Sequence, residues 1–417
     1  MNLVNLVISD PLNILSETLL LDSAAQERSQ RSLQTAAYFA AFIALGLSTG
    51  SLGPTLPGLA AQLNVGLGAI SYLFTARSLG YVIGSVRSGS LFDNRPAHVV
   101  LGTMLLLMSL AMVLVPLTGH LSVMLGLMML LGAAESGLDV GANTLLVRLH
   151  AKRVGPFMTA LHSFFGIGAL VAPLIVAQTN LLGYETVTSY FVLAFLVLPI
   201  AAYTIRLPNQ IHASAPPQTS SGATNRSFVF LIALFLFLYV GAEVGFAGWI
   251  FTYATEQRLA APVTAAYLTS LFWGSLTAGR IAMIPLTARI RPTLILLIGI
   301  TGSLLSVGLI IVAPSSVVIV FAGSIGLGLF MAPIFPTALS FASRRIEMTG
   351  RVTAWLVVGG SLGCMLVPWL IGQLFETLGP RSLVYVAELT LLLAAVVLAV
   401  ALQRTKASRV READGWK

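Results

Sequence analysis

Apolar runs of about twenty residues recur along the whole of this 417-residue chain. A helix of that length crosses the hydrocarbon core of a bilayer, which is roughly 30 Å thick. Charged residues make up only 9% of the sequence, whereas about 25% of the residues in a soluble globular protein are charged. The runs do not alternate between apolar and polar residues, as the strands of a membrane barrel do. The sequence therefore predicts an all-α protein that crosses a membrane many times.

We expect twelve transmembrane helices, some of them joined by very short turns. Thr118-Gly119-His120 separates the third and fourth spans, and Pro314-Ser315 separates the ninth and tenth. The expected spans are residues 34–58, 69–90, 98–117, 121–147, 155–178, 187–206, 227–253, 264–286, 293–313, 315–341, 351–374 and 381–402. The apolar segment at residues 1–8 is too short to span and lacks the basic start of a signal peptide, so we expect a tail there.

The basic residues indicate which ends of the helices face the cytoplasm, because cytoplasmic loops hold an excess of Lys and Arg. With both termini in the cytoplasm, 19 of the 23 Lys and Arg residues fall on that side. Arg258 and Arg381 fall outside, and Arg77 and Arg280 fall within spans. The net charge of +8 then belongs to cytoplasmic loops, which argues against nucleic-acid binding. We expect a multi-pass protein of the cell membrane, or of the inner membrane in a bacterium.

The two halves of the chain align when the sequence is shifted by 195 residues. Residues 173–178 then fall on residues 368–373, and Gly46 falls on Gly241. Six spans followed by six in the same orientation make a parallel repeat about an axis along the membrane normal, and such proteins rock one half against the other around a midplane site. The expected units are a cytoplasmic tail (1–33), a six-helix bundle (34–206), a cytoplasmic linker (207–226), a second six-helix bundle (227–403) and a cytoplasmic tail (404–417).

Charges inside the spans are the first candidates for function, because a charge near the middle of a bilayer costs roughly 2.5–3.5 kcal/mol on insertion scales. Glu135, Asp139 and Asn143 follow one another at intervals of four residues, so they share one face of a helix. One carboxylate can hold a proton or, with Asn143, offer oxygen ligands to Na⁺. We therefore assign Asp139 and Glu135 to ion coupling. The alternative is a structural pair with Arg77 of the second span.

The loop after the second span carries a family resemblance. Gly89-Ser90-Leu91-Phe92-Asp93-Asn94-Arg95-Pro96 resembles the Gly-x-Leu-Ala-Asp-Arg loop of the major facilitator superfamily, although the Arg comes one place late and the later basic residues are missing. The resemblance implies the major facilitator fold, with two six-helix bundles. It also implies that Asp93 and Arg95 act as conformational locks between helices, a role that we extend to Arg77 and Arg280.

Within this superfamily the chain resembles the sodium-dependent glucose transporter group and the related fucose permeases. The stretches that carry this resemblance are residues 137–144, 161–173, 239–253, 272–280 and 332–337. The resemblance implies a secondary transporter for a hexose or a similar small solute, driven by Na⁺ or H⁺. The chain lacks the Pro-Glu-Ser-Pro-Arg segment of the facilitative sugar porters. It also lacks the first-span acid of the fucose permeases, having only Ser48, Thr49, Ser51 and Thr55 there, so the coupling ion stays open.

Polar and aromatic side chains of several spans make up the expected substrate site. Either ring nitrogen of His162 can bond a sugar hydroxyl or handle a proton, and Glu243 offers a carboxylate in the half opposite Asp139. Sugar rings also present C–H faces that stack on aromatic planes. The expected substrate-binding residues are Asn143, His162, Glu243, Trp249, Phe272 and Trp273. Each has a competing interpretation as a helix-packing residue or, for the aromatics, as part of an interfacial belt.

The sequence favours a secondary active transporter of a small neutral polar solute, with a monosaccharide as the leading substrate class. The excess of carboxylates over basic groups among the site candidates argues against anionic solutes. The alternatives are an efflux transporter for amphipathic or lipidic compounds and a non-transporting sensor or scaffold. We expect no enzyme, because the sequence has no nucleotide loop, metal cluster or Ser-His-Asp arrangement. We also expect a monomer without cofactor or bound metal, apart from the coupling ion.

Overall fold

The computed structural model describes residues 11–208, 226–287, 289–346 and 349–414, and all regular secondary structure in this part of the chain is helical. The first half of the chain forms α1 (Pro11–Leu63), α2 (Leu67–Ile70), α3 (Tyr72–Asn94), α4 (Ala97–Leu114), α5 (Leu121–His150), α6 (Val154–Leu181) and α7 (Ser189–Ile205). The second half forms α8 (Arg226–Glu256), α9 (Pro262–Thr287), α10 (Pro292–Val312), α11 (Val317–Met331), α12 (Ile334–Ser343), α13 (Gly350–Leu378) and α14 (Ser382–Asp414). Short 3₁₀ turns precede α6 and α7 and follow α4.

Every span expected from the sequence is helical, but not every one is strongly apolar. Ten helical segments in the described part of the chain are long and apolar enough to cross a membrane. The two expected spans outside this set are α3 and α9, in which Arg77, Arg87 and Arg280 lower the mean hydropathy. Both helices contact the opposite half of the chain, α3 through α13 and α9 through α6. Their polar residues are therefore tolerated inside the protein.

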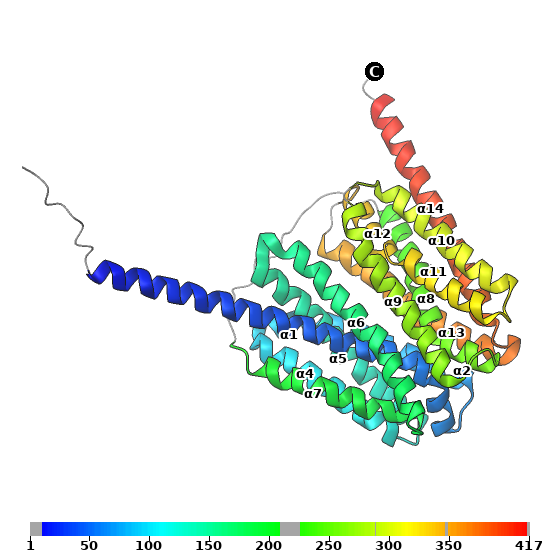
Figure 1. The fold of residues 1–417 in the computed structure, drawn as a ribbon. Helices are drawn as coiled ribbons and strands as arrows, with labels where there is room; N and C mark the ends of the chain where they lie inside the picture. Colours follow the sequence, from blue (N-terminus) through cyan, green and yellow to red (C-terminus); the bar gives the residue numbers. More distant parts are fainter. Residues whose placement is uncertain (1–10, 209–225, 288, 347–348, 415–417) are drawn as a thin grey trace, which may run out of the picture.

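Two helices depart from the expected boundaries. The tenth span is divided into α11 and α12, because Pro333 and Pro336 cannot continue the backbone hydrogen bonding of α11. The first span extends back to Pro11, so part of the expected tail is a continuation of the helix. The start of α1 and the end of α14 project away from the bundles in different directions (Figure 1).

The repeat in the sequence corresponds to a repeat in helix packing. Gly168 brings α6 so close to α1 that a Cβ there would lie 2.1 Å from a carbonyl oxygen of α1. At the position 195 residues later, a Cβ on Gly363 of α13 would lie 2.2 Å from a carbonyl oxygen of α8. Gly46 and Gly241 face these two contacts from α1 and α8. The structure thus confirms the correspondence of the first and fifth spans with the seventh and eleventh.

The two halves meet at one end of the molecule, which we call the distal end. The opposite end, where α7 ends at Ile205 and α8 begins at Arg226, we call the linker end. At the distal end the Ser270 hydroxyl of α9 donates to the carbonyl oxygen of Leu170 in α6 at 2.7 Å. Gly53 of α1 approaches α8 so closely that a Cβ would lie 2.7 Å from the carbonyl oxygen of Ala247. These contacts hold α9 against α6 and α8 against α1 on the distal side.

Toward the linker end the halves separate. The Thr75 hydroxyl of α3 donates to the carbonyl oxygen of Met365 in α13 at 3.4 Å. Val86 lies on the same face of α3 as Thr75, because eleven residues make about three helical turns. Its side chain is nevertheless 79% exposed. Figure 1 shows the two groups of helices joined at one end and spread at the other. The structure is therefore a conformation that is closed distally and open toward the linker end.

Candidate functional site

The polar residues of the first half lie where α3 and α5 run in parallel. Glycines allow this approach, since a Cβ on Gly132 of α5 would lie 1.9 Å from the carbonyl oxygen of Arg77. Facing side chains of the two helices then form pairs whose residue numbers differ by 58, and we call each such pair a rung. Arg77 meets Glu135 in one rung, and Tyr81 meets Asp139 in the next. The spacing of four residues in both helices thus places two different acid sites one turn apart.

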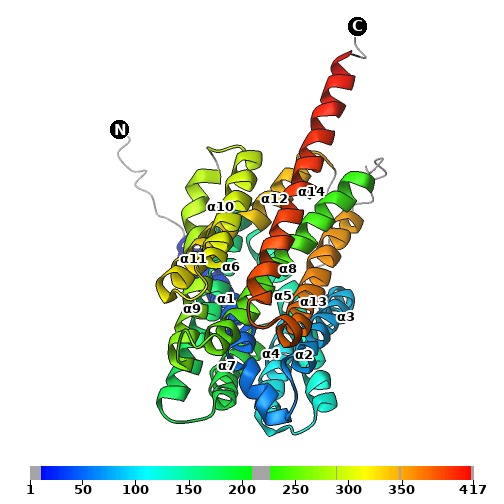
Figure 2. The same cartoon turned by 90° about the vertical axis from the view of Figure 1, so that its right-hand side faces the viewer.

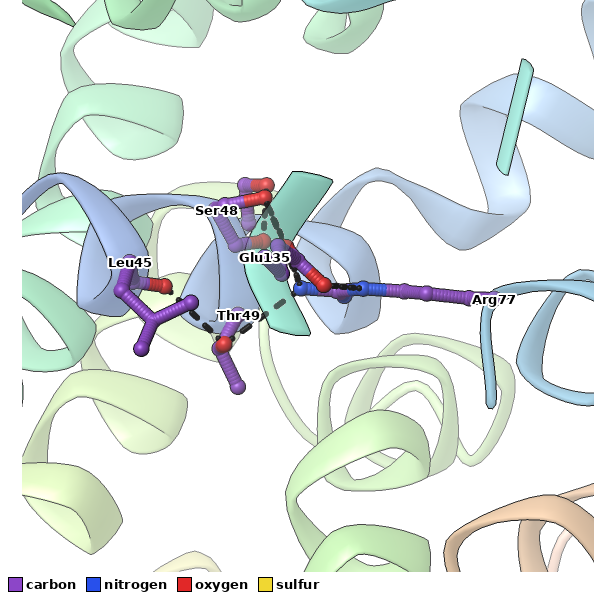
Figure 3. A network of polar contacts seen from close by, with 6 residues as sticks. Leu45, Ser48, Thr49, Arg77 and Glu135 are labelled. Atoms are coloured by element: carbon purple, nitrogen blue, oxygen red, sulfur yellow. Dashed lines mark hydrogen bonds and ion pairs between the residues drawn. The ribbon is translucent and has the colours of Figure 1, made fainter. Parts of the chain in front are cut away.

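The first rung is a closed ion pair (Figure 3). Arg77 Nε donates to Glu135 Oε2 at 2.8 Å, and its Nη2 pairs with Oε1. From α1, the Ser48 hydroxyl donates to Glu135 Oε1 at 2.5 Å, and Thr49 accepts from Arg77 Nη2 at 3.3 Å. The Arg77 and Glu135 side chains are 12% and 4% exposed. Because the carboxylate is bidentate and hydrogen-bonded, this geometry favours structural neutralisation, the alternative to ion coupling for Glu135.

The second rung holds Asp139 with neutral donors. Tyr81 donates its hydroxyl to Asp139 Oδ2, and Asn143 Nδ2 donates to Oδ1 at 2.7 Å. Among the described residues, no Lys, Arg or His nitrogen lies within ion-pair distance of this carboxylate. Asp139 is half-buried. The structure therefore brings Asp139 and Asn143 together, as expected, and leaves the carboxylate without a countercharge.

The second half has its own acid and arginine, and they are loosely paired. Glu243 of α8 is buried, and its Oε2 accepts the hydroxyl hydrogen of Tyr239. Arg280 Nη2 of α9 lies 3.8 Å from Glu243 Oε1. Arg280 Nε is buried without a hydrogen-bond partner in the described structure. Arg280, which we predicted to act in gating, thus lies against a predicted substrate residue and retains unused hydrogen-bonding capacity.

His162 faces this arginine from the first half. The helices α6 and α9 cross at Gly166 and Thr277, where a Cβ on the glycine would lie 2.0 Å from the threonine hydroxyl oxygen. His162 and Arg280 lie about one turn from this crossing toward the linker end, within electrostatic range of each other. The His162 side chain is exposed and rests edge-on against Phe42, with ring centroids 5.4 Å apart. On the linker-end side of the crossing between α6 and α9, polar groups of both halves therefore lie near each other.

The predicted aromatic substrate residues are all buried in this conformation. Trp249 donates its indole N–H to the carbonyl oxygen of Pro368 at 2.9 Å and stacks on Phe375. Phe272 packs inside the second half. Trp273 contacts Phe165 of α6 edge-on, at a centroid distance of 6.1 Å. Substrate contact by these rings stays a prediction, because here they serve helix packing and the contact between the halves.

The predicted locks of the loop after α3 lie at the linker end. Arg148 Nη2 of α5 donates to Asp93 Oδ1 at 2.7 Å, so this pair fastens the end of α3 to the end of α5. Arg95 caps α3 through its backbone N–H, which donates to the carbonyl oxygen of Leu91. The Asp93 contact thus joins two helices of the same half, whereas the side chain of Arg95 is exposed.

Sequence reasoning missed three residues of this region. Tyr81 and Tyr239 each hold a carboxylate, and each lies four residues along a helix from a charged residue of the same site, Arg77 or Glu243. That spacing is the signal that could have found them. Cys364 of α13 is half-buried and within electrostatic range of both Arg77 and Glu243. No group of three or more His, Cys, Asp and Glu residues suited to a metal ion occurs in the described part of the chain.

Comparison with solved structures agrees with this architecture. The nucleoside transporter NupG superposes with a TM-score of 0.70 at 14% identity, covering 90% of this chain and 99% of its own. A bacterial homolog of the human lysosomal transporter Spinster, in an inward-facing and unoccupied conformation, gives 0.68 at 11% identity. That match covers 89% of this chain and 95% of the other. At these identities the likeness concerns the fold alone.

Comparison with known sequences finds relatives at higher identity than the solved structures. The chain is 28% identical to sodium-dependent glucose transporter 1A of Mus musculus over 81% of this chain and 88% of that protein. It is 30% identical to sodium-dependent glucose transporter 1 of Xenopus laevis, over 78% of this chain and 72% of that protein. Major facilitator superfamily domain-containing protein 4A of Homo sapiens is 27% identical over 85% of this chain and 88% of its own length. The sequence pattern of the Major Facilitator Superfamily matches residues 38–368 and 285–417. The chain therefore belongs to the Major Facilitator Superfamily of membrane transporters.

Proposed function

We propose that this protein is a secondary active transporter of a small neutral polar solute, with a monosaccharide such as a hexose as the substrate and Na⁺ as the coupling ion. It crosses the cell membrane twelve times with both termini in the cytoplasm, so the linker end faces inward. The names of the sodium-dependent glucose transporters to which the chain is similar support the substrate and the ion. The separation of the halves at the linker end then corresponds to an inward-open state.

One observation carries the proposal: the two in-membrane arginines differ in how completely they are paired. Arg77 is held through its Nε and Nη2 by Glu135 and by hydroxyl groups of α1. Arg280 is held less tightly, because its contact with Glu243 is long and its Nε has no partner in the described structure. A solute hydroxyl can accept from Arg280 and donate to Glu243 at once. We therefore place solute binding at Glu243 and Arg280, with His162 opposite them.

Asp139 supplies the coupling site in this proposal. A carboxylate that has only neutral donors can attract a cation, whereas Glu135 already has a countercharge in Arg77. Sodium is a hard cation for which carboxylate and amide oxygens are suitable ligands, and Asn143 carries an amide beside Asp139. H⁺ is the alternative coupling ion, since protonation would also neutralise the carboxylate.

Transport by purified protein in proteoliposomes tests the proposal. Radiolabelled glucose uptake is measured with an inward Na⁺ gradient, an inward H⁺ gradient or no gradient. Counterflow, in which internal unlabelled glucose exchanges for external labelled glucose at equal ion concentrations, reports binding and alternation without coupling. We expect Na⁺-driven accumulation in the wild type. Asp139→Asn should lose accumulation and retain counterflow.

Glu388→Gln is the matched control, because Glu388 is another in-membrane carboxylate, on α14 and outside the site. It should behave as the wild type does. Accumulation driven by H⁺ alone would replace Na⁺ by H⁺ in the proposal. Absence of both uptake and counterflow in folded protein would contradict the hexose assignment and favour efflux of amphipathic compounds.

A further inference from the structure

A groove on the second half lies outside the proposed transport site, where α14 passes the start of α8 at the linker end. Figure 2 shows the two helices side by side there. The groove has a volume of about 420 Å³ and is lined by Arg226, Ser227, Phe230, Leu231 and Arg404. We call it the α8–α14 groove. Its lining combines two guanidinium groups, a hydroxyl and apolar side chains, and it contains no acidic residue among those described.

Along α8, the polar residues that line the groove come first and the apolar ones follow. Arg226 and Ser227 occupy the first turn of α8, and Phe230 and Leu231 follow one turn deeper. Phe230 is 65% exposed, so a large apolar surface lies directly inside a basic rim. Arg404, which is exposed on α14, adds the second positive charge. A molecule that fits this order has an anionic end at the rim and a hydrocarbon end directed along the span.

We propose that the α8–α14 groove binds an anionic glycerophospholipid, with its phosphate on Arg226 and Arg404 and one acyl chain along Phe230. Arginine forms bidentate hydrogen bonds to phosphate oxygens, and basic pockets between transmembrane helices on the cytoplasmic side bind anionic headgroups. A free phosphate ion would use the arginines but leave Phe230 uncovered. The lipid satisfies both parts of the groove and ties the first helix of the second half to its last.

The test compares lipids of equal chain length added to the purified full-length protein in detergent. Dioleoyl phosphatidylglycerol is the anionic probe, dioleoyl phosphatidylcholine is the zwitterionic one, and glycerol phosphate without chains reports the headgroup alone. Unfolding temperature and lipid retention in native mass spectrometry are recorded. We expect phosphatidylglycerol to be retained and to raise the unfolding temperature, with little effect of the other two. Each arginine near the surface contributes about a five-fold gain in affinity.

The variant Arg226→Gln/Arg404→Gln should lose the effect of phosphatidylglycerol, and Arg226→Lys/Arg404→Lys should keep most of it. Arg289→Gln/Arg291→Gln removes the same charge from an exposed turn at the same end of the same half and should respond as the wild type does. The proposal is overturned if phosphatidylcholine stabilises equally, if glycerol phosphate alone suffices, or if the groove variant responds as the Arg289/Arg291 control does. The unfolding temperature of the glutamine variant without added lipid shows whether that variant is folded.

Discussion

Glu376 of α13 accepts a hydrogen bond from the backbone N–H of Gly68 in α2 at 2.8 Å, and this contact joins the two halves at the distal end. The neighbouring Gln373 donates its amide N–H to the carbonyl oxygen of the same Gly68 at 2.7 Å. Both polar groups of one peptide segment in the first half are thus held by side chains of the second. A transporter that alternates must break these bonds when the distal end opens, so they bias the equilibrium toward the closed state.

Replacing Gly68 by Ala should weaken this closure. A Cβ at Gly68 would lie 2.9–3.0 Å from the Glu376 carboxylate, so the carboxylate must move away. Loss of one or two hydrogen bonds shifts the equilibrium roughly ten-fold toward the distally open state. The measurement is the labelling rate of Cys364, the one cysteine in the chain, by a membrane-impermeant maleimide added from the distal side. We expect the rate to rise in the variant.

Gly119→Ala is the control for this experiment, because Gly119 lies in a turn at the same end and a Cβ there meets nothing within 4 Å. Its labelling rate should equal that of the wild type. An unchanged rate in Gly68→Ala, with the protein folded, would show that the contact between Glu376 and Gly68 does not control distal opening.

The buried pair between Arg77 and Glu135 predicts a non-additive effect on stability. Removing one partner leaves an uncompensated buried charge, which costs about 3–5 kcal/mol in stability, whereas replacing both can be nearly neutral. We therefore expect Arg77→Gln to unfold at a much lower temperature than Arg77→Gln/Glu135→Gln. The measurement is thermal unfolding of the two single variants and the double variant in one detergent. If Glu135→Gln alone is as stable as the wild type yet loses ion coupling, the structural role is wrong.

The helices and the repeat could be predicted from the sequence because each depends on a local pattern. Apolar length marks most spans, and Pro333 and Pro336 mark the division of the tenth. The helix that begins at Pro11 was missed, since hydropathy reports membrane burial and says nothing of a helix outside it. Likewise the mean hydropathy of α3 and α9 is too low to mark them as membrane spans, because these helices face protein as well as lipid.

The site could be predicted only in part. The spacing of four residues indicated that Glu135 and Asp139 share a face of α5, and Arg77 was considered as a partner. The pairing of Arg280 with Glu243 joins two helices whose relative rotation no local pattern encodes. The burial of Trp249 likewise results from packing against α13, so its chemistry alone suggested a stacking role.

The loose pair in the second half predicts a change in solute affinity with little change in stability. Because Arg280 and Glu243 are 3.8 Å apart and Arg280 is 22% exposed on its side chain, little pairing energy is lost when the charge is removed. Glu243→Gln keeps the shape and an oxygen acceptor for Tyr239. We expect the KM of counterflow to rise about ten-fold or more through loss of a charge-assisted hydrogen bond to the solute.

Thermal unfolding of Glu243→Gln is measured beside that of Arg77→Gln, which serves as the destabilised reference. The unfolding temperature of Glu243→Gln should stay within a few degrees of the wild type. A fall as large as that of Arg77→Gln, with an unchanged KM, would assign Glu243 to structure and remove it from the substrate site.

Cys364 lies within electrostatic range of both Arg77 and Glu243, so we expect bound solute to protect its thiol. The thiol is half-buried on α13. We expect maleimide added from the linker end to label Cys364 and stop transport, and saturating glucose to slow labelling several-fold. Cys364→Ser should transport and resist the reagent. As a control, Ser343→Cys in the Cys364→Ser background places a thiol at the exposed end of α12, where glucose should not alter labelling. Equal labelling of Cys364 with and without glucose, in protein shown to transport it, would place the solute away from α13.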